Sequence, residues 1–230
     1  SLQLDGGYKN IVNLSDTWAT KCLEATSMER EEVGLQHLKI ALITFPGDTV
    51  STEVSSCLAR VCSTITDQGG LVVSPANSPH VRHNIFLGQV VDAVKNTVLE
   101  PTIAYGKIPS TNGFHLMDCP GSGDWVELVS GLGATGCELM IAIVDNAKAA
   151  KTLQSNPLVP LLRVTTEYAQ VNTPQKSAFS DFDLALSVDD STWHTQLLDK
   201  IIETASGKYI PKQDENWNFQ ITRGSTGVSM

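Results

Sequence analysis

The sequence predicts a doubly wound α/β fold, a Rossmann-like three-layer sandwich in which helices cover both faces of a mainly parallel sheet. Two observations predict it. Short, nearly continuous apolar runs recur along the 230 residues, as expected for strands that are buried on both faces. Longer segments with apolar residues at helical spacing separate these runs. Strands and helices that alternate in this way form parallel sheets through right-handed crossovers.

Each element has its own signal in the sequence. The first strand ends in Pro46-Gly47-Asp48, and Ser51 stands near the start of the next helix as a candidate N-cap. Gly207 is the stop signal of the closing helix. The predicted helices are residues 13–33, 49–66, 81–95, 125–132 and 191–206. The predicted strands are residues 39–45, 71–73, 114–118, 137–144, 158–164 and 182–188.

The chain is expected to form one large domain with short additions at its ends. Residues 1–34 are a leading segment and helix, residues 35–212 are the α/β domain, and residues 213–230 are a C-terminal tail that packs on the same domain. Neither a linker nor a repeat of fixed period interrupts the α/β pattern.

Composition narrows the class of protein. The net charge is −9, and the 16 basic residues never cluster, so nucleic acid is not expected as a partner. Five cysteines without paired short spacing argue against a disulfide framework and favour a reducing cytoplasm. We expect no signal peptide and no membrane span, because the first residues lack an apolar h-region and no run of about 18 apolar residues occurs.

Residues 113–123 carry the most informative chemistry. The expected strand ends in Asp118 and Cys119, which places an acid and a thiol at the carboxyl edge of a parallel sheet, where open α/β folds bind ligands. Asp118 is suited to hold a metal or a substrate hydroxyl, although a strand-end Asp also caps a following helix. Cys119 is either a thiolate ligand or a small buried residue.

Histidines and glycines offer weaker candidates. His80 and His83 are three residues apart, a spacing that lets both face one metal. The preceding Ser-Pro favours a loop with two solvent-facing histidines, and the metal pair is the alternative. His115 lies inside a strand and is expected to be packed. The glycine spacing of residues 131–136 follows a helix instead of a strand, which argues against a dinucleotide loop.

Several segments together resemble a known family. The chain reads Gly-Phe-His-Leu-Met-Asp-Cys-Pro-Gly at residues 113–121 and Val-Ser-Gly-Leu-Gly-Ala-Thr-Gly at residues 129–136. These stretches, the strand-helix-strand pattern of residues 38–75 and the Phe-Gln-Ile-Thr-Arg-Gly tail at residues 219–224 are similar to the C-terminal domain of the galactarate dehydratase / altronate hydrolase (altronate dehydratase) family.

The resemblance implies a hydro-lyase that removes water from a sugar acid to give a 2-keto-3-deoxy acid, with iron or manganese as the divalent cofactor. A divalent cation suits this chemistry because it clamps the carboxylate and polarises the developing enolate. The candidate catalytic residues are Asp118, Cys119, Ser122 and Asp48, and the candidate metal ligands are Asp118, His80 and His83. The expected partners are a small sugar acid and a separate N-terminal domain or subunit of the same enzyme, and a homo-oligomer is kept open.

Three loops depart from the family pattern. Phe45 replaces a cysteine of the family turn, residues 74–77 lack the two acids of a Glu-Thr-Pro-Glu segment, and residues 144–148 lack an arginine. Two hypotheses therefore remain open. The chain is either a sugar-acid dehydratase domain with a divergent site or a non-catalytic scaffold or ligand-binding domain that keeps the dehydratase fold.

Overall fold

The computed structural model describes residues 33–45, 47–93, 102–119, 124–144, 153–156, 158–166, 180–184 and 190–212. Contacts divide the chain into two compact units, Ser1–Glu31 and Glu32–Met230, and every described residue belongs to the second. Residues 13–32 of the predicted leading helix and the predicted tail at 213–230 therefore lie outside the described residues.

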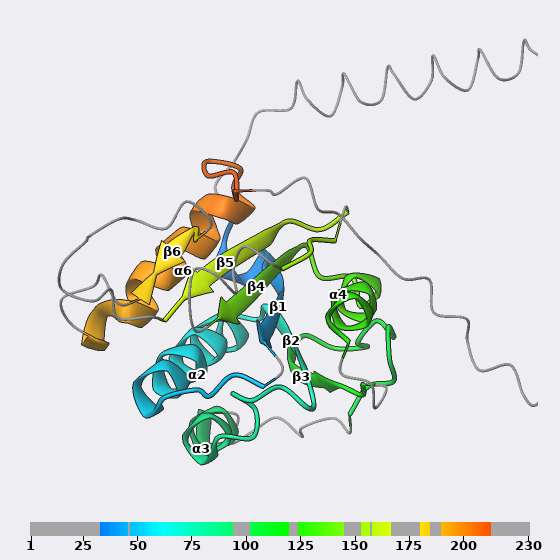
Figure 1. Cartoon of the computed structure of the whole chain (residues 1–230), viewed down its shortest axis with the longest axis horizontal. Coiled ribbons are helices and arrows are strands. Elements are labelled where there is room, and N and C mark those ends of the chain that lie inside the picture. Colours follow the sequence, from blue (N-terminus) through cyan, green and yellow to red (C-terminus); the bar gives the residue numbers. More distant parts are fainter. Residues whose placement is uncertain are drawn as a thin grey trace, which may run out of the picture. The chain divides into compact units, whose positions relative to one another are not determined.

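The second unit is built on one parallel sheet of six strands, in the order β3-β2-β1-β4-β5-β6 (Figure 1). The strands are β1 Lys39–Thr44, β2 Leu71–Pro75, β3 Gly113–Met117, β4 Leu139–Val144, β5 Leu161–Thr165 and β6 Phe182–Asp183. This order confirms the predicted doubly wound α/β fold, because the chain winds from β1 outward in one direction and then returns to continue from β4 in the other.

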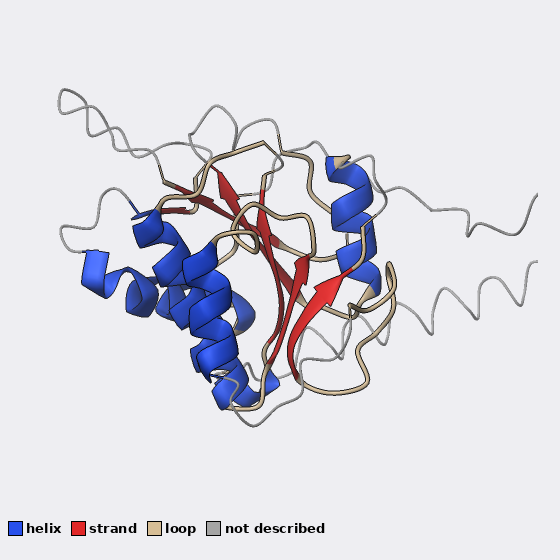
Figure 2. Ribbon diagram, turned by 90° about the horizontal axis from the view of Figure 1, so that it is seen from below, coloured by secondary structure: helices blue, strands red, loops and turns tan. Residues whose placement is uncertain are grey.

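Helices cover both faces of the sheet. They are α2 Thr52–Asp67, α3 Asn84–Ala93, α4 Trp125–Ala134 and α6 Trp193–Ala205, and two short 3-10 helices occur at η1 Leu35–His37 and η3 Asp190–Thr192. Figures 1 and 2 show α2, α3 and α6 on one face and α4 on the other. None of the helices in the described ranges is long and apolar enough to cross a membrane.

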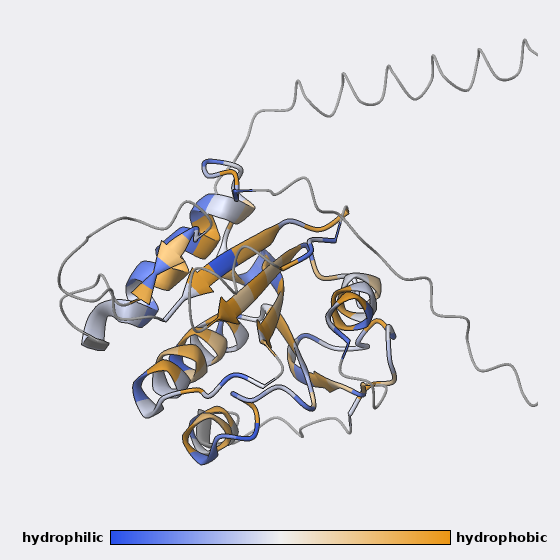
Figure 3. Ribbon diagram, viewed as in Figure 1, coloured by the Kyte–Doolittle hydropathy of each residue, from blue (hydrophilic) through white to orange (hydrophobic). Residues whose placement is uncertain are grey.

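Alternate residues of each strand supply the two cores. On β1, Ile40 and Leu42 pack toward α2 and α6, whereas Ala41 and Ile43 pack with residues of α4. Every residue of β2, β4 and β5 is buried, and the central strands are the most hydrophobic part of the ribbon in Figure 3. Burial on both faces explains why these strands read as continuous apolar runs in the sequence.

Local signals set most helix boundaries. Ser51 caps α2, since its hydroxyl oxygen accepts a hydrogen bond from the N–H of Val54 at 3.2 Å. Asp124 caps α4 in the same way through the N–H of Glu127 at 3.1 Å. Gly207 adopts φ +68° just after α6, which confirms its predicted role as a stop signal.

Several predicted boundaries differ from the structure, and for two of them the reason is identifiable. The helix predicted at residues 81–95 begins at Asn84, because residues 76–83 form turns around a buried histidine. The strand predicted at residues 158–164 begins at Leu161, and Leu158 is 89% exposed. Leu158 was assigned to the strand because it is apolar, but an apolar residue can also lie exposed outside a sheet.

Candidate functional site

A cavity of about 310 Å³ opens at the carboxyl ends of β1 and β4, the two neighbouring strands from which the chain winds in opposite directions. It is lined by Thr44, Asp48, Thr49, Val50, Ser51, Val54, Ile143, Thr166 and Trp193. In open α/β sheets, ligands bind at this switch point, where the crossovers leave a crevice. Its volume falls at the lower end of the range for small-molecule sites. We call this cavity the switch-point cleft.

The loop between β1 and α2 forms one wall of the cleft. The N–H of Asp48 donates to the carbonyl of Phe45 at 3.1 Å, and Gly47 adopts φ +96°, a conformation that favours glycine. This turn brings Asp48 and Thr49 over the carboxyl end of β1. The capped first turn of α2 then closes the wall.

Apolar side chains supply another part of the lining. Trp193 starts α6 and is 4% exposed, and it faces the cleft together with Ile143 from β4 and Val54 from α2. Thr166 follows β5 and adds a hydroxyl, and its backbone N–H donates to Val144 at 3.0 Å. The cleft therefore offers hydroxyl groups and one carboxylate on some sides and apolar surface on others.

A buried histidine lies beneath the floor of the cleft. His80 is 0% exposed, and its Nδ1 lies 3.0 Å from the hydroxyl of Thr44 while its Nε2 lies 3.2 Å from the hydroxyl of Ser74. Its ring packs edge-on against Phe86, with centroids 4.8 Å apart. Burial lowers the pKa of His80 to about 3, so the imidazole is neutral at pH 7.

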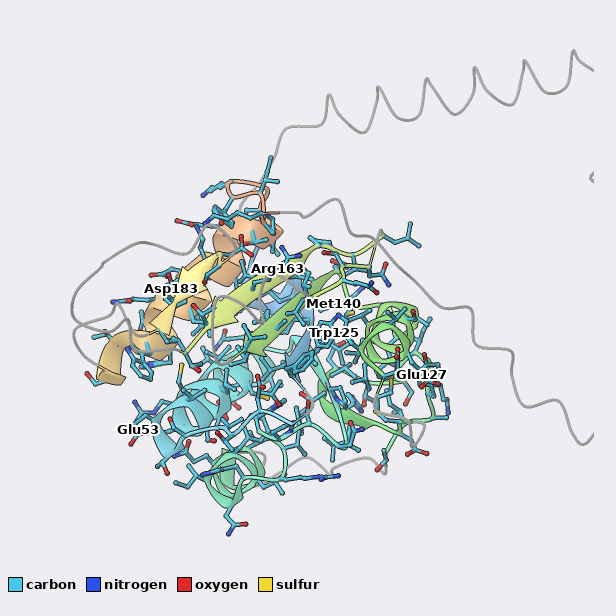
Figure 4. All side chains as sticks on the ribbon, viewed as in Figure 1. Glu53, Trp125, Glu127, Met140, Arg163 and Asp183 are labelled. Carbon is cyan, nitrogen blue, oxygen red and sulfur yellow. The ribbon has the colours of Figure 1, made fainter. Side chains whose placement is uncertain are left out.

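The electrostatics of the cleft do not favour a strongly anionic ligand. Neither Lys nor Arg lines it among the residues that the structure describes, whereas Asp48 contributes a carboxyl group. Glu53 stands at the amino end of α2 (Figure 4), where its own backbone N–H and the Ser51 hydroxyl lower its pKa. The first turn of α2 therefore already interacts with a protein carboxylate.

Asp118 and Cys119 follow β3, two strands away from the cleft. The strands are parallel, so Asp118 and Cys119 lie at the carboxyl edge of the sheet, as expected, and the turn after β1 lies at the same edge. Neither residue is among those that line the switch-point cleft. Residues 76–83 occupy the space between, as shown by the bonds from Thr44 to Ser78 and His80.

The surroundings of Asp118 and Cys119 differ. Asp118 is exposed, and its N–H donates to the carbonyl of Ile103 at 2.8 Å. Cys119 is half-buried, and its thiol donates to the carbonyl of Met117 at 3.3 Å. Burial raises the pKa of Cys119, although the backbone N–H groups of Ala76 and Asn77 oppose this shift. A thiol is therefore favoured over a thiolate at pH 7.

The remaining predicted residues are dispersed. Asp48 lines the cleft, whereas Ser122 lies outside the described residues. The prediction that His80 faces solvent is wrong, because the loop folds inward and gives both ring nitrogens hydroxyl partners. His83 is partly exposed just before α3. His115 is buried in β3 as expected, with Nε2 2.9 Å from the carbonyl of Thr111.

The described residues do not fit a divalent metal. Both ring nitrogens of His80 are engaged by hydroxyl groups, so the proposed pair with His83 has only one available histidine. Over the described ranges, no three His, Cys, Asp or Glu side chains come together as a metal site would require.

A buried arginine was not anticipated from the sequence. Arg163 on β5 (Figure 4) is 2% exposed, and its Nη2 donates to the carbonyl of Leu153 and to the hydroxyl of Ser155, both at 3.2 Å. Its Nη1 donates to the carbonyl of Lys212. Asp181 accepts from the N–H of Arg163 at 2.8 Å and from that of Lys212 at 2.7 Å. This network holds the segment after α6 against β5 and the residues that precede β6.

Sequence reasoning also missed Thr44, Thr166 and Trp193 as lining residues. The available signal was position, because Thr44 and Thr166 stand at or just after the carboxyl ends of apolar runs. Trp193 gave no such signal, since it reaches the cleft only through the packing of α6 against α2.

Comparisons with known proteins add no relative. No protein-family model matches the chain. No curated protein matches it either.

Proposed function

We propose that this domain binds a sugar acid carrying a single carboxylate in the switch-point cleft. The observation that carries the proposal is the cavity of about 310 Å³ at the carboxyl ends of β1 and β4, whose lining combines hydroxyl groups and one carboxyl group with apolar side chains. The resemblance to sugar-acid dehydratases supports the same ligand class.

The lining matches the two kinds of surface on a sugar acid. Hydroxyl and carboxyl groups of Asp48, Thr49 and Thr166 are suited to hydrogen bonds with the ligand's hydroxyl groups. The indole of Trp193 and the side chain of Ile143 offer apolar surface to the C–H faces of the carbon chain. Ligand sites commonly combine an apolar lining with a few polar groups that set orientation.

Charge favours a monocarboxylate over a dicarboxylate. Asp48 in the lining repels a second ligand carboxylate, and the described lining residues include neither Lys nor Arg. A hexonate such as altronate is therefore favoured over a hexarate such as galactarate.

Titration calorimetry with altronate and galactarate at low salt tests this proposal. Altronate is expected to bind more tightly than galactarate. Asp48→Asn is expected to narrow the difference by about threefold or more, because it removes a repulsive charge from the lining. Asp67→Asn is the matched control, since it changes the net charge equally at the far end of α2. Absence of binding by both acids would refute the proposed function.

Dehydration of the bound acid is a second candidate function. It is supported by Asp118 and Cys119, which stand at the same edge of the sheet as the cleft and include an exposed carboxyl group suited to proton transfer. Against it, both residues lie outside the cavity, and the described residues offer no metal site. Binding without turnover is therefore the function that the geometry supports best.

A further inference from the structure

The arrangement of hydrogen bonds around His80 determines what Thr44 offers to the cleft. Thr44 lines the cavity, and its hydroxyl oxygen accepts from the backbone N–H of His80 at 3.2 Å. The same oxygen lies 3.0 Å from Nδ1 of the His80 ring. The ring is neutral at pH 7, so one of its nitrogens carries a proton and the other accepts one.

Ser74 selects between the two tautomers. It is fully buried, and Nε2 of His80 is the partner of its hydroxyl within the described part of the chain. If Nε2 carried the proton, the Ser74 hydroxyl would accept it and its own proton would be buried without an acceptor there. If Nε2 is unprotonated, Ser74 donates to it and is satisfied. Each arrangement leaves one hydroxyl proton without an acceptor among the described residues, that of Ser74 in the first and that of Thr44 in the second. Thr44 is 1% exposed but lines the cavity, whereas Ser74 is 0% exposed and does not line it. Because buried polar hydrogens are nearly always paired, and a group in the cavity can pair with Thr44, the second arrangement is favoured.

The protonation state of Nε2 sets that of Nδ1, which lies beside Thr44, because a neutral imidazole carries only one ring proton. With Nε2 accepting from Ser74, Nδ1 carries the proton and donates to the Thr44 oxygen. That oxygen then accepts two hydrogen bonds from His80, one from the ring and one from the backbone. Its own proton has no acceptor among the described residues and is left for a group in the cavity.

We infer that Ser74 and His80 are positioning residues that fix the Thr44 hydroxyl as a hydrogen-bond donor at the floor of the switch-point cleft. The ligand must then present an acceptor oxygen to Thr44, and the carboxylate of a sugar acid is the strongest acceptor that such a ligand carries. This inference rests on the proposed function for the identity of the ligand, but the state of the imidazole is a property of the protein alone.

The first experiment needs no ligand. Two-bond ¹H–¹⁵N correlation spectra at pH 7, with His80 assigned by its absence from His80→Asn, report which ring nitrogen is protonated. We expect Nδ1 to be protonated and Nε2 to be unprotonated. Thr44→Val should shift mainly the Nδ1 resonance, and Ser74→Ala mainly the Nε2 resonance. A protonated Nε2 would overturn the inference whether or not any acid binds.

The second experiment separates positioning from stability with two substitutions at one residue. The amide nitrogen of Asn occupies the place of Nδ1, so His80→Asn keeps a donor to Thr44 and loses the contact with Ser74. His80→Gln reaches toward Ser74 and loses the contact with Thr44. Each variant gives up one of the two ring hydrogen bonds, so a similar loss of stability is expected for both.

Altronate affinity is the readout that distinguishes them. We expect His80→Asn to bind within about threefold of the unmodified protein, and His80→Gln and Thr44→Val to bind roughly tenfold more weakly. Equal losses for His80→Asn and His80→Gln, with both proteins shown to be folded by urea unfolding, would contradict a positioning role. If altronate does not bind the unmodified protein, the proposed function fails, and the protonation of the ring still decides the inference about Thr44.

Discussion

A neutral, fully buried imidazole makes the stability of this domain depend on pH. The pKa of His80 is about 3 in the folded protein, against 6.5 for an ordinary histidine. The imidazole of His80 therefore binds a proton below about pH 6.5 in the unfolded chain, but only near pH 3 in the folded protein. The stability contributed by the neutral ring is complete above pH 6.5 and is lost as the pH falls below that value.

The expected size of this loss can be measured against a variant that does not titrate at residue 80. Between pH 7.5 and pH 5, the unmodified protein should lose about 2 kcal/mol more unfolding free energy than His80→Asn. Urea unfolding at both pH values gives the comparison, and His194→Asn, a partly exposed residue of α6, serves as the control. Parallel losses in the unmodified protein and His80→Asn would show that His80 is accessible to protons in the folded state.

Burial also ranks the reactivity of the cysteines. It raises the pKa of Cys57 and Cys137 to about 12 and raises that of Cys62 further, and all three side chains are buried. Cys119 is partly exposed, with a smaller rise. In a Cys22→Ser background, iodoacetamide at pH 8 should therefore modify Cys119 first.

Peptide mapping by mass spectrometry after short labelling checks this order. Cys119→Ser should leave the folded protein almost unlabelled, and addition of urea should expose the other three thiols. Labelling of Cys57, Cys62 or Cys137 at the same rate as Cys119 in the folded protein would contradict the order. Because Cys119 lies outside the cleft, altronate should not protect it.

At the residue scale, the sequence was informative about position and uninformative about burial. Asp48 was a candidate site residue in the turn that follows the first strand, and it does line the cleft. His80 was correctly placed in a loop but wrongly placed in solvent. The hydroxyls of Thr44 and Ser74 that satisfy its ring come from two different strands, so their meeting depends on the register of the sheet.

Two glycines in helices have opposite structural roles, and substitution should separate them. A side chain at Gly131 in α4 would place its Cβ 2.3 Å from the ring of Tyr105, whose hydroxyl donates to the carbonyl of Glu127 at 2.6 Å. The ring is therefore held in place, and Gly131→Ala should destabilise the protein by about 2 kcal/mol. Gly88 in α3 has open space around it, so Gly88→Ala should stabilise the protein by about 0.7 kcal/mol.

Thermal and urea unfolding of both variants measures these effects. A combined Gly131→Ala and Tyr105→Ala protein should lose less stability than the sum of the two single variants, because the second change removes the clash caused by the first. Strict additivity would show that Tyr105 is not the obstacle. The glycine spacing of residues 131–136 is thus explained by packing at Gly131 and by the turn that follows α4, where Gly136 has φ +83°.

At the element scale, predictability followed the strength of the local signal. β1 and β4 were predicted within two residues at each end, because each is a continuous apolar run between turn residues. α3 was predicted too long at its start, since Val81 fits a helical pattern but belongs to the turns around His80. β6 spans two described residues, and residues 185–188 of its predicted range lie outside the described ranges.

At the scale of the whole molecule, the alternation of strands and helices in the sequence predicted the parallel sheet. It did not predict which strand ends line the cleft or which polar side chains meet in the interior. Right-handed crossovers require strand ends at one edge, and that expectation was confirmed. Which ends share a cavity depends on what fills the space between them, and residues 76–83 separate the end of β3 from the switch-point cleft. The buried network of Arg163 and Asp181 was likewise beyond prediction, because its members are brought together by the segment after α6.

Phe45 illustrates why this chain is expected to bind without rapid catalysis. It stands where the family resemblance implies a cysteine, and its ring packs on Trp125 with centroids 5.7 Å apart, so the position serves packing between the end of β1 and the start of α4. Residues 74–77 supply no carboxyl group. Loss of one positioned catalytic group commonly costs about a hundredfold in rate, and losses within one site are not additive.

We therefore expect the chain alone to turn over altronate and galactarate far more slowly than roughly 1 per second, the lower end of typical enzyme rates. A discontinuous assay for the 2-keto-3-deoxy acid, run anaerobically with iron or manganese added, measures this directly. Asp118→Ala and Cys119→Ser are the variants that decide the source of any residual activity, because they remove the two described groups at the end of β3 without altering the cleft. Turnover at about 1 per second or faster that is abolished by Asp118→Ala would establish the second candidate function in place of binding alone. Altronate binding with no product under the same conditions is the outcome that the geometry of the cleft predicts.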